Sequence, residues 1–156
     1  MTVLPNQSSS MRRVAKRNEP FTGKEAAALD FWCRLLLDTD CDTTARAVEV
    51  SRSVFEQYCE YFDIDAETFA DKVVVDIGCG PAGALHHFQA SHKFGVDVLA
   101  KYYTVLPIDW QDIIYLGCAA EQMPLMDEYV DVVISSNALD HVASFESAIR
   151  LEAIES

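Results

Sequence analysis

A glycine-rich turn directly after an apolar run is the first feature of the sequence that could do chemistry. Residues 78–83 read Gly-Cys-Gly-Pro-Ala-Gly and satisfy the spacing G-x-G-x-x-G. Glycine at Gly78 and Gly80 lets the chain turn sharply and lets a ligand approach the backbone, while Pro81 fits the first turn of a helix. Asp97, 19 residues after Gly78, ends the next predicted strand, where its carboxylate can accept both hydroxyls of a ribose. This pattern predicts a site for a cofactor that contains adenosine.

The charge of Asp76, two residues before Gly78, bears on which adenosine cofactor fits. In a dinucleotide site the pyrophosphate lies at the start of the following helix, and Coulomb repulsion from a neighbouring carboxylate weakens its binding. S-adenosylmethionine (SAM) has no phosphate and carries an ammonium and a sulfonium, which an acidic neighbour attracts. Asp76 therefore favours SAM over a nicotinamide dinucleotide, whereas the glycine turn and Asp97 fit both ligands.

Four segments resemble, in the expected order, the motifs of class I SAM-dependent methyltransferases, and in particular small-molecule methyltransferase domains of type 11. Residues 74–80 are similar to the first motif, hydrophobic-Asp/Glu-x-Gly-x-Gly. Residues 94–98 resemble the strand whose terminal acid holds the SAM ribose, and residues 118–125 resemble the segment that borders the adenine. Residues 131–142 are similar to the fourth strand and to the loop beneath which methyl transfer occurs.

The resemblance implies which residues bind SAM. They are Asp76, Gly78, Gly80, Pro81, Asp97, Val98, Ala120, Glu121 and Asn137. Glu121 or its neighbours would meet the exocyclic amine of the adenine, although a plain position on a loop surface is an open alternative. His141 is the candidate catalytic base, because it lies just past the fourth predicted strand and histidine titrates near neutrality. A structural role for His141 in the first turn of a helix also stays open.

The implied reaction is in-line transfer of a methyl group from the sulfonium to a small-molecule acceptor. Such a reaction asks the enzyme to align donor and acceptor and to exclude water, and it needs no nucleophilic side chain. Methyltransferases that act on DNA or glutamine usually carry Asn/Asp-Pro-Pro-Tyr/Phe after the fourth strand, where this chain has Ser-Asn-Ala-Leu at 136–139. A net charge of −13 also disfavours nucleic acid as a partner, because phosphate binding draws on Lys and Arg.

The elements that position these residues follow from a change in hydrophobic period at Asp71. Residues 72–77 form a continuous run rich in β-branched side chains, typical of a strand buried on both faces of a parallel sheet. The alternation that follows predicts an α/β fold, a Rossmann-like doubly wound parallel sheet of about four strands. Further strands are expected at 93–97, 113–118 and 130–135, and helical stretches at 82–90, 98–105 and from about 144 onward.

Two or three helices are expected before the sheet. Helical spacing of apolar residues predicts one over 22–38, capped by Thr22, and one over 44–62, capped by Asp42 or Thr43. On this basis we expect three segments, namely a disordered tail (1–20), a helical lid on the acceptor side (21–70) and a partial SAM-binding Rossmann-like domain (71–156).

The family's sheet normally has seven strands, and this sequence accounts for four. We therefore expect either a fragment truncated after the fourth strand or a partner chain or homo-oligomer that covers the exposed edge of the sheet. Two other functions stay open, a non-catalytic SAM-binding module that acts with a partner and a fragment of an NAD-dependent oxidoreductase.

The remaining composition predicts a chain without a metal site or a membrane span. The five cysteines are scattered and form no C-x-x-C pair, which favours neither a disulfide framework nor zinc and fits a reducing cytoplasm. Cys79, inside the glycine turn, is expected to be a small buried filler rather than a nucleophile. No apolar run approaches the roughly 20 residues that a membrane-spanning helix needs.

Overall fold

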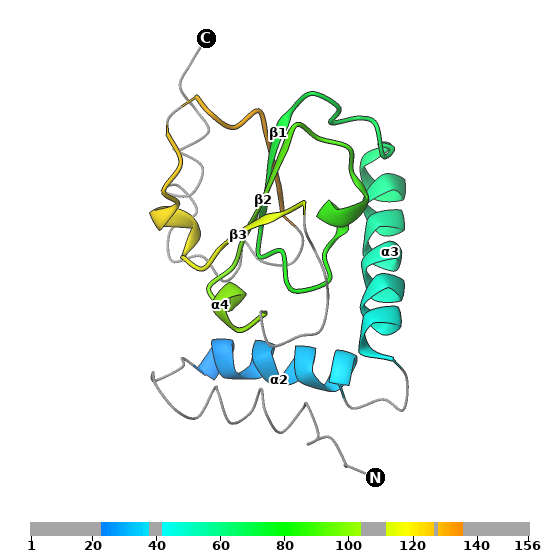
Figure 1. The fold of residues 1–156 in the computed structure, drawn as a ribbon, viewed down its shortest axis with the longest axis vertical. Coiled ribbons are helices and arrows are strands. Elements are labelled where there is room, and N and C mark those ends of the chain that lie inside the picture. Colours follow the sequence, from blue (N-terminus) through cyan, green and yellow to red (C-terminus); the bar gives the residue numbers. More distant parts are fainter. Residues whose placement is uncertain (1–22, 38–41, 104–111, 127, 136–156) are drawn as a thin grey trace.

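A single parallel sheet organises the fold (Figure 1). The computed structural model describes residues 23–37, 42–103, 112–126 and 128–135. Within them the sheet has the strand order β3-β2-β1-β4, and every adjacent pair is parallel. The strands are β1 (Val73–Ile77), β2 (His92–Val96), β3 (Ile114–Leu116) and β4 (Val132–Ser135). The order and the direction of the strands confirm the predicted partial Rossmann-like α/β fold.

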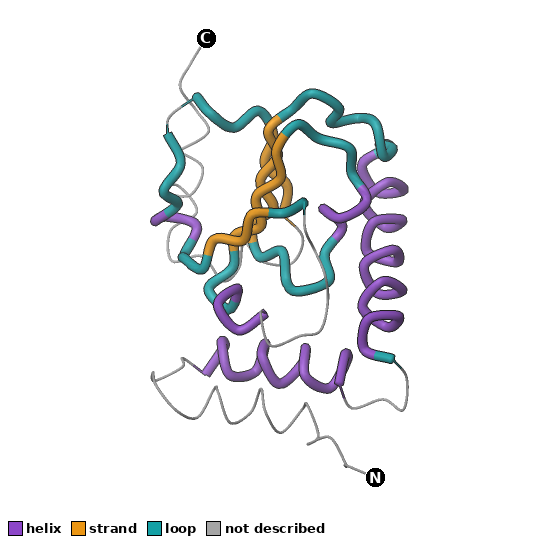
Figure 2. The backbone as a smooth tube through the Cα atoms, viewed as in Figure 1, coloured by secondary structure: helices purple, strands orange, loops and turns teal. Residues whose placement is uncertain are grey.

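Among the described residues, two long helices lie at one side and one end of this sheet, and three short helical turns lie in its connections (Figure 2). Helix α3 runs alongside the sheet, whereas α2 crosses the end of the sheet at which α4 lies (Figure 1). The strands begin at the end of the sheet where α3 ends and run toward α2 (Figure 1). Because all strands are parallel, α2 and α4 lie at their carboxyl ends. The bounds are α2 (Gly23–Leu37), α3 (Thr43–Phe62), η1 (Ala84–His87), α4 (Ala100–Tyr103) and η2 (Ala120–Gln122).

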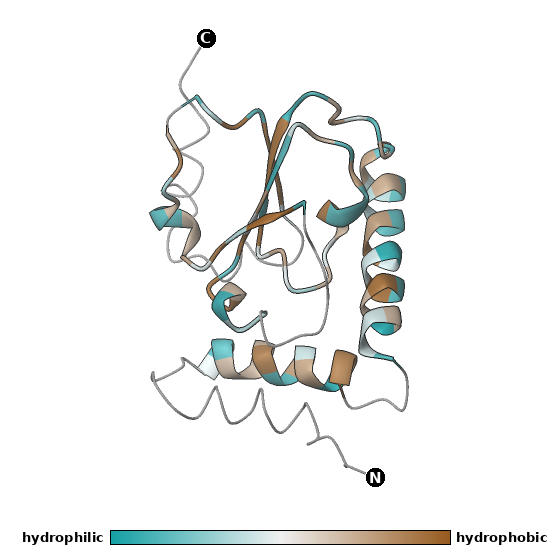
Figure 3. Cartoon of the chain, in the orientation of Figure 1, coloured by the Kyte–Doolittle hydropathy of each residue, from teal (hydrophilic) through white to brown (hydrophobic). Residues whose placement is uncertain are grey.

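Alternation along β1 divides the core between the two faces of the sheet. Val74 faces the side covered by α3 and η1, where it packs with Tyr58, Phe69 and Phe88. Residues from the 118–130 segment cover the opposite face, where the buried side chains are Val75, Ile77, Phe94, Val96 and Ala120. Figure 3 shows the hydrophobic colouring of these strands. Both faces of β1 are covered, as the continuous apolar run predicted.

The connection after β1 differs from its prediction. A helix was expected over 82–90, but the structure has only the 3-10 turn η1, Ala84–His87. Gly83 and Phe88, which bound that turn, are both extended, with ψ values of 175° and 138°. The hydroxyl of Ser51, buried on α3, donates to the carbonyl of Gly83 at 2.7 Å. The Gly83 carbonyl therefore accepts a hydrogen bond from α3 instead of one from within a helix. The prediction of a longer helix was wrong.

The buried stripe of α2 also differs from the one expected. The apolar spacing indicated Ala27, Ala28, Phe31, Trp32, Leu35 and Leu36, whereas the fully buried residues are Leu29, Cys33 and Leu36. These three recur at helical spacing and pack with Ala82 and Leu99 at the carboxyl end of the sheet. Phe31 is 55% exposed as a result. Trp32 lies at the border of the buried stripe, where it can reach the glycine turn.

Helix α3 begins as predicted. The side chain of Asp42 accepts hydrogen bonds from the backbone N–H groups of Thr44 at 2.8 Å and Ala45 at 3.4 Å, which confirms Asp42 as the N-cap. The helix ends at Asp63, whose left-handed backbone lets its N–H donate to the carbonyl of Cys59. None of the helices among the described residues is long and apolar enough to cross a membrane. Thr22 and the stretch beyond Ser135 lie outside the described residues.

Candidate cofactor site

The glycine turn lies at the carboxyl ends of β1 and β2, where ligands bind in open parallel sheets. Gly78 and Gly80 both have positive φ angles, 71° and 59°, a conformation that favours glycine. The N–H of Gly78 donates to the carbonyl of Val96 at 2.7 Å and fastens the turn to the end of β2. Pro81 follows and is fully buried. The turn is thus fixed between the two strands that carry the predicted site residues.

Asp97 joins this turn to the start of α4. Its Oδ2 atom accepts a hydrogen bond from the N–H of Gly80 at 3.1 Å, and its Oδ1 atom accepts one from the N–H of Leu99 at 2.9 Å. A carboxylate oxygen has two lone pairs, so each oxygen keeps one acceptor position after these bonds. Asp97 therefore shapes the site in the free chain and still has acceptor capacity for a ligand.

Asp76 lies beneath the turn rather than on its surface. It is 2% exposed. One of its carboxyl oxygens, Oδ2, lies 3.3 Å from the point that a methyl group on Gly83 would occupy. Burial, and then the charge of Asp97, raise the pKa of Asp76 to about 8. The other oxygen, Oδ1, is buried and has no hydrogen-bond partner within the described part of the chain. The site therefore holds a carboxyl group that stays largely protonated at neutral pH unless a positive charge approaches.

Two further side chains line this acidic corner. Burial, followed by the charges of Asp76 and Asp97, raises the pKa of Cys79 well above its ordinary value. A thiol held protonated in this way fits the expected filler and not a nucleophile. Burial and the charge of Asp97 likewise raise the pKa of Tyr103. The sequence predicted a helical stretch after Asp97 but did not indicate Tyr103 as a residue near the site. Its position, six residues after the acid that ends β2, was the available signal.

The remaining predicted cofactor residues lie further along the same edge. Val98 follows Asp97 and is 38% exposed. Ala120, in η2, is buried against Ile77 and Val96, the last residues of β1 and β2. Glu121 lies beside it on the same turn and is half-buried. The structure thus brings these three residues to the carboxyl ends of the strands.

The predicted residues after β4 fall outside the described residues. The hydroxyl of Ser135, the last residue of β4, donates to the carbonyl of Ile77 at 3.0 Å and ties the ends of β4 and β1 together. Asn137 and His141 follow Ser135 in the sequence, and their assigned roles stay predictions. The cover of the outer edge of β4 stays a prediction too.

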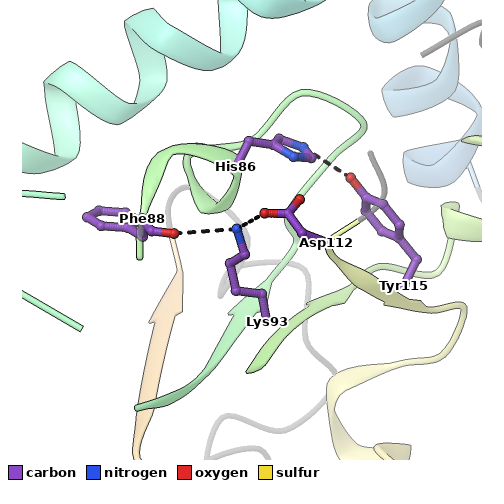
Figure 4. A network of polar contacts seen from close by, with 5 residues as sticks. All are labelled: His86, Phe88, Lys93, Asp112 and Tyr115. Atoms are coloured by element: carbon purple, nitrogen blue, oxygen red, sulfur yellow. Dashed lines mark hydrogen bonds and ion pairs between the residues drawn. The ribbon is translucent and has the colours of Figure 1, made fainter. Parts of the chain in front are cut away.

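A second polar cluster lies away from this corner, under η1 (Figure 4). Buried Lys93 of β2 forms an ion pair with Asp112 and donates to the carbonyl of Phe88 at 3.4 Å. The Nε2 atom of His86 lies 3.2 Å from the hydroxyl of Tyr115, and burial lowers the pKa of His86 to about 3. This histidine is half-buried and pairs with Tyr115. No cluster that could hold a metal ion occurs among the described residues.

Known proteins resemble this chain in sequence pattern and in fold. A family model, "Methyltransferase domain", matches residues 75–151. No curated protein matches the chain. The solved structure of a candidate S-adenosyl-L-methionine-dependent methyltransferase from Methanococcus maripaludis has a TM-score of 0.51 and 17% identity, over 87% of this chain and 59% of its own. That likeness supports the fold.

Two further solved structures have lower TM-scores. The YcgJ protein from Bacillus subtilis has a TM-score of 0.48 and 18% identity, over 64% of this chain and 44% of its own. Phosphoethanolamine N-methyltransferase 1 from Haemonchus contortus was solved with phosphoethanolamine and S-adenosylhomocysteine. It has a TM-score of 0.46 and 15% identity, over 84% of this chain and 29% of its own. The chain thus spans 59% or less of the length of each of the three structures. With the family match and the ordered motifs at one edge of a parallel sheet, residues 75–151 are identified as a methyltransferase domain.

Proposed function

We propose that the chain binds SAM at the carboxyl ends of β1 and β2 and directs its methyl group to a small-molecule acceptor. One observation carries the proposal: the N–H of Gly80 donates to Asp97 at 3.1 Å, so the glycine turn and the strand-end acid form one unit. A ligand that approaches the turn therefore meets the carboxylate that can hold its ribose. The family match over residues 75–151 supports the same reading.

Each residue of the unit has a distinct part in this proposal. The exposed backbone at Gly78 lets the methionine end of the ligand approach, whereas Gly80 is covered by Trp32, and the free lone pairs of Asp97 accept the ribose hydroxyls. Asp76 contributes negative charge when the cationic end arrives. SAM supplies the activated methyl group, so these residues need only bind it, orient it and keep water away. Asn137 and, as general base for an acceptor that must lose a proton, His141 complete the proposed set.

The lid on the acceptor side, expected over residues 21–70, is assigned in this proposal to α2 alone. The sequence indicated aromatic residues of both helices, Phe31 and Trp32 with Tyr58 and Tyr61. Tyr58 packs instead with Val74 near the start of β1, at the opposite end of the strands from the glycine turn. Helix α2 crosses the carboxyl ends, where an acceptor must meet the methyl group (Figure 1). An acceptor that reaches the site beside α2 is consistent with a small molecule.

Calorimetric titration with SAM, S-adenosylhomocysteine and NAD tests the cofactor. SAM and S-adenosylhomocysteine are expected to bind, and binding of NAD alone would overturn the proposal. Asp97→Asn keeps one acceptor oxygen and the size of the side chain but removes the charge, and it should weaken SAM binding about 10- to 150-fold, since a charged hydrogen bond contributes about 1.5–3 kcal/mol. Asp71→Asn, at an exposed carboxyl just before β1, is the matched control. Unchanged SAM binding in Asp97→Asn would refute the ribose assignment.

A further inference from the structure

The indole ring of Trp32 covers one of the two glycines with positive φ in the turn. A methyl group in place of the Gly80 hydrogen would lie 2.3 Å from Cζ2 of Trp32 and 3.0 Å from both Cε2 and Cη2. The ring therefore packs directly against the Cα atom of Gly80, which is buried. Gly78, at the start of the turn, is exposed. The turn is thus open at its first glycine and covered by a side chain at its second.

The covered glycine is the one that is bonded to the proposed ribose acid. The N–H of Gly80 donates to Oδ2 of Asp97 at 3.1 Å, so the ring that packs on Gly80 lies next to the group that would hold the ribose. Asp97 is half-buried, and each of its oxygens keeps an acceptor position after accepting one backbone bond. A ligand that reaches from the exposed Gly78 to the carboxylate of Asp97 therefore meets the ring of Trp32 over Gly80.

Helix α2 is docked on the site by side chains other than Trp32. Three buried residues pack with residues just after the glycine turn and at the start of α4. They are Leu29, Cys33 and Leu36, and they share a cluster with Ala82, Leu99 and Ala100. Trp32 is only partly buried at the border of that cluster, and its ring partner Phe31, with centroids 5.2 Å apart, is 55% exposed. The ring can therefore leave Gly80 without loss of the contacts that anchor α2.

We propose that Trp32 is an autoinhibitory element of the cofactor site: its ring occupies the space over Gly80 that the cofactor needs, and the cofactor binds when the ring is displaced. This inference rests on the proposed function and adds regulation to the same site. The affinity for SAM is then reduced by the fraction of molecules in which the ring has left Gly80. A second molecule that binds better with Trp32 displaced strengthens SAM binding, and SAM strengthens its binding by the same factor.

Calorimetric titration of SAM and S-adenosylhomocysteine into Trp32→Ala tests the proposal. Removal of the ring uncovers Gly80, so both ligands should bind about 2- to 10-fold more tightly, the factor that one aromatic packing contact represents. Phe62→Ala is the matched control, because Phe62 is the last residue of α3 and is 52% exposed, and it should leave both affinities unchanged. Weaker or unchanged binding of the ligands by Trp32→Ala would overturn the inference.

Tryptophan emission gives a second measurement that keeps Trp32 in place. The chain has two tryptophans, so Trp110→Phe leaves Trp32 as the only one. SAM and S-adenosylhomocysteine should each shift the emission of Trp32 to longer wavelength, because the ring exchanges its packing on the turn for water. An unchanged emission, or a shift to shorter wavelength, at saturating ligand would overturn the inference and leave the proposed function standing. If neither the unmodified chain nor Trp32→Ala binds either ligand, the proposed function fails as well.

Discussion

Asp76 makes a stability prediction that the structure allows to be worked out in some detail. In the folded chain this carboxyl is 2% exposed, with Oδ1 lacking a hydrogen-bond partner among the described residues. Its pKa is raised from 3.8 to about 8, first by burial and then by the charge of Asp97. The folded chain therefore holds this proton more tightly than the unfolded chain does. Its contribution to folding is complete below pH 3.8 and is lost as the pH rises toward 8.

The size of this loss follows from about 1.4 kcal/mol per pH unit between the two pKa values. The free energy of unfolding should be lower by about 2 kcal/mol at pH 5.5, and by about 5 kcal/mol at pH 8, than it would be with a neutral group. Asp76→Asn has no such charge and removes the pH-dependent penalty. An amide without partners at this position has its own cost of about 1–3 kcal/mol, but that cost is the same at every pH.

The measurement is urea unfolding of the wild-type chain and Asp76→Asn at pH 5.5 and pH 8. The stability difference, Asp76→Asn minus wild type, should rise by about 3 kcal/mol between the two pH values. Comparison at each pH cancels other titrating groups, including His86, whose lowered pKa acts in the opposite direction. Asp71→Asn, at an exposed carboxyl, should show no such rise. A difference for Asp76→Asn that stays constant within about 1 kcal/mol would refute the burial argument.

Two further predictions concern packing. Gly80→Ala would place a methyl group 2.3 Å from Trp32 at a φ of +59°, and it should lower the free energy of unfolding, measured in urea, by about 2–4 kcal/mol. Gly117→Ala is the control: its methyl group would lie 3.6 Å from the nearest atom, and it should cost under about 1 kcal/mol. Similar losses of stability in the two variants would contradict the contact between Gly80 and Trp32. Asp112→Ala leaves the ammonium of Lys93 buried without its ion-pair partner and should cost about 1–3 kcal/mol in thermal unfolding. Lys93→Met should cost less, because the Asp112 side chain is 62% exposed and remains hydrated. The reverse ranking would contradict this account.

The sheet could be predicted because its information is local. The run Val73-Val74-Val75 is typical of a buried strand, and the glycines after it indicate the turn. The structure confirms that turn, because Gly78 and Gly80 have positive φ angles. Spacing along the chain then indicated Asp97. The length of η1 could not be predicted, because it depends on the hydroxyl of Ser51 from a distant helix. The set of α2 residues that is buried likewise depends on packing against Ala82 and Leu99, which are distant in the sequence.

The register of the sheet explains why the two acids share one corner. Asp76 pairs with Gly95 and Ile77 pairs with Val96, so Asp97 follows directly beside the start of the glycine turn. Gly95 has no side chain, and a methyl group there would lie 2.8 Å from the sulfur of Cys79, which fills the space next to Asp76. Water is thus kept from one carboxyl while the other is fixed by backbone N–H groups. In the proposed function a cation is the ligand that relieves this arrangement. The sequence indicated such a preference from Asp76 alone, and the register adds that Asp97 lies beside it.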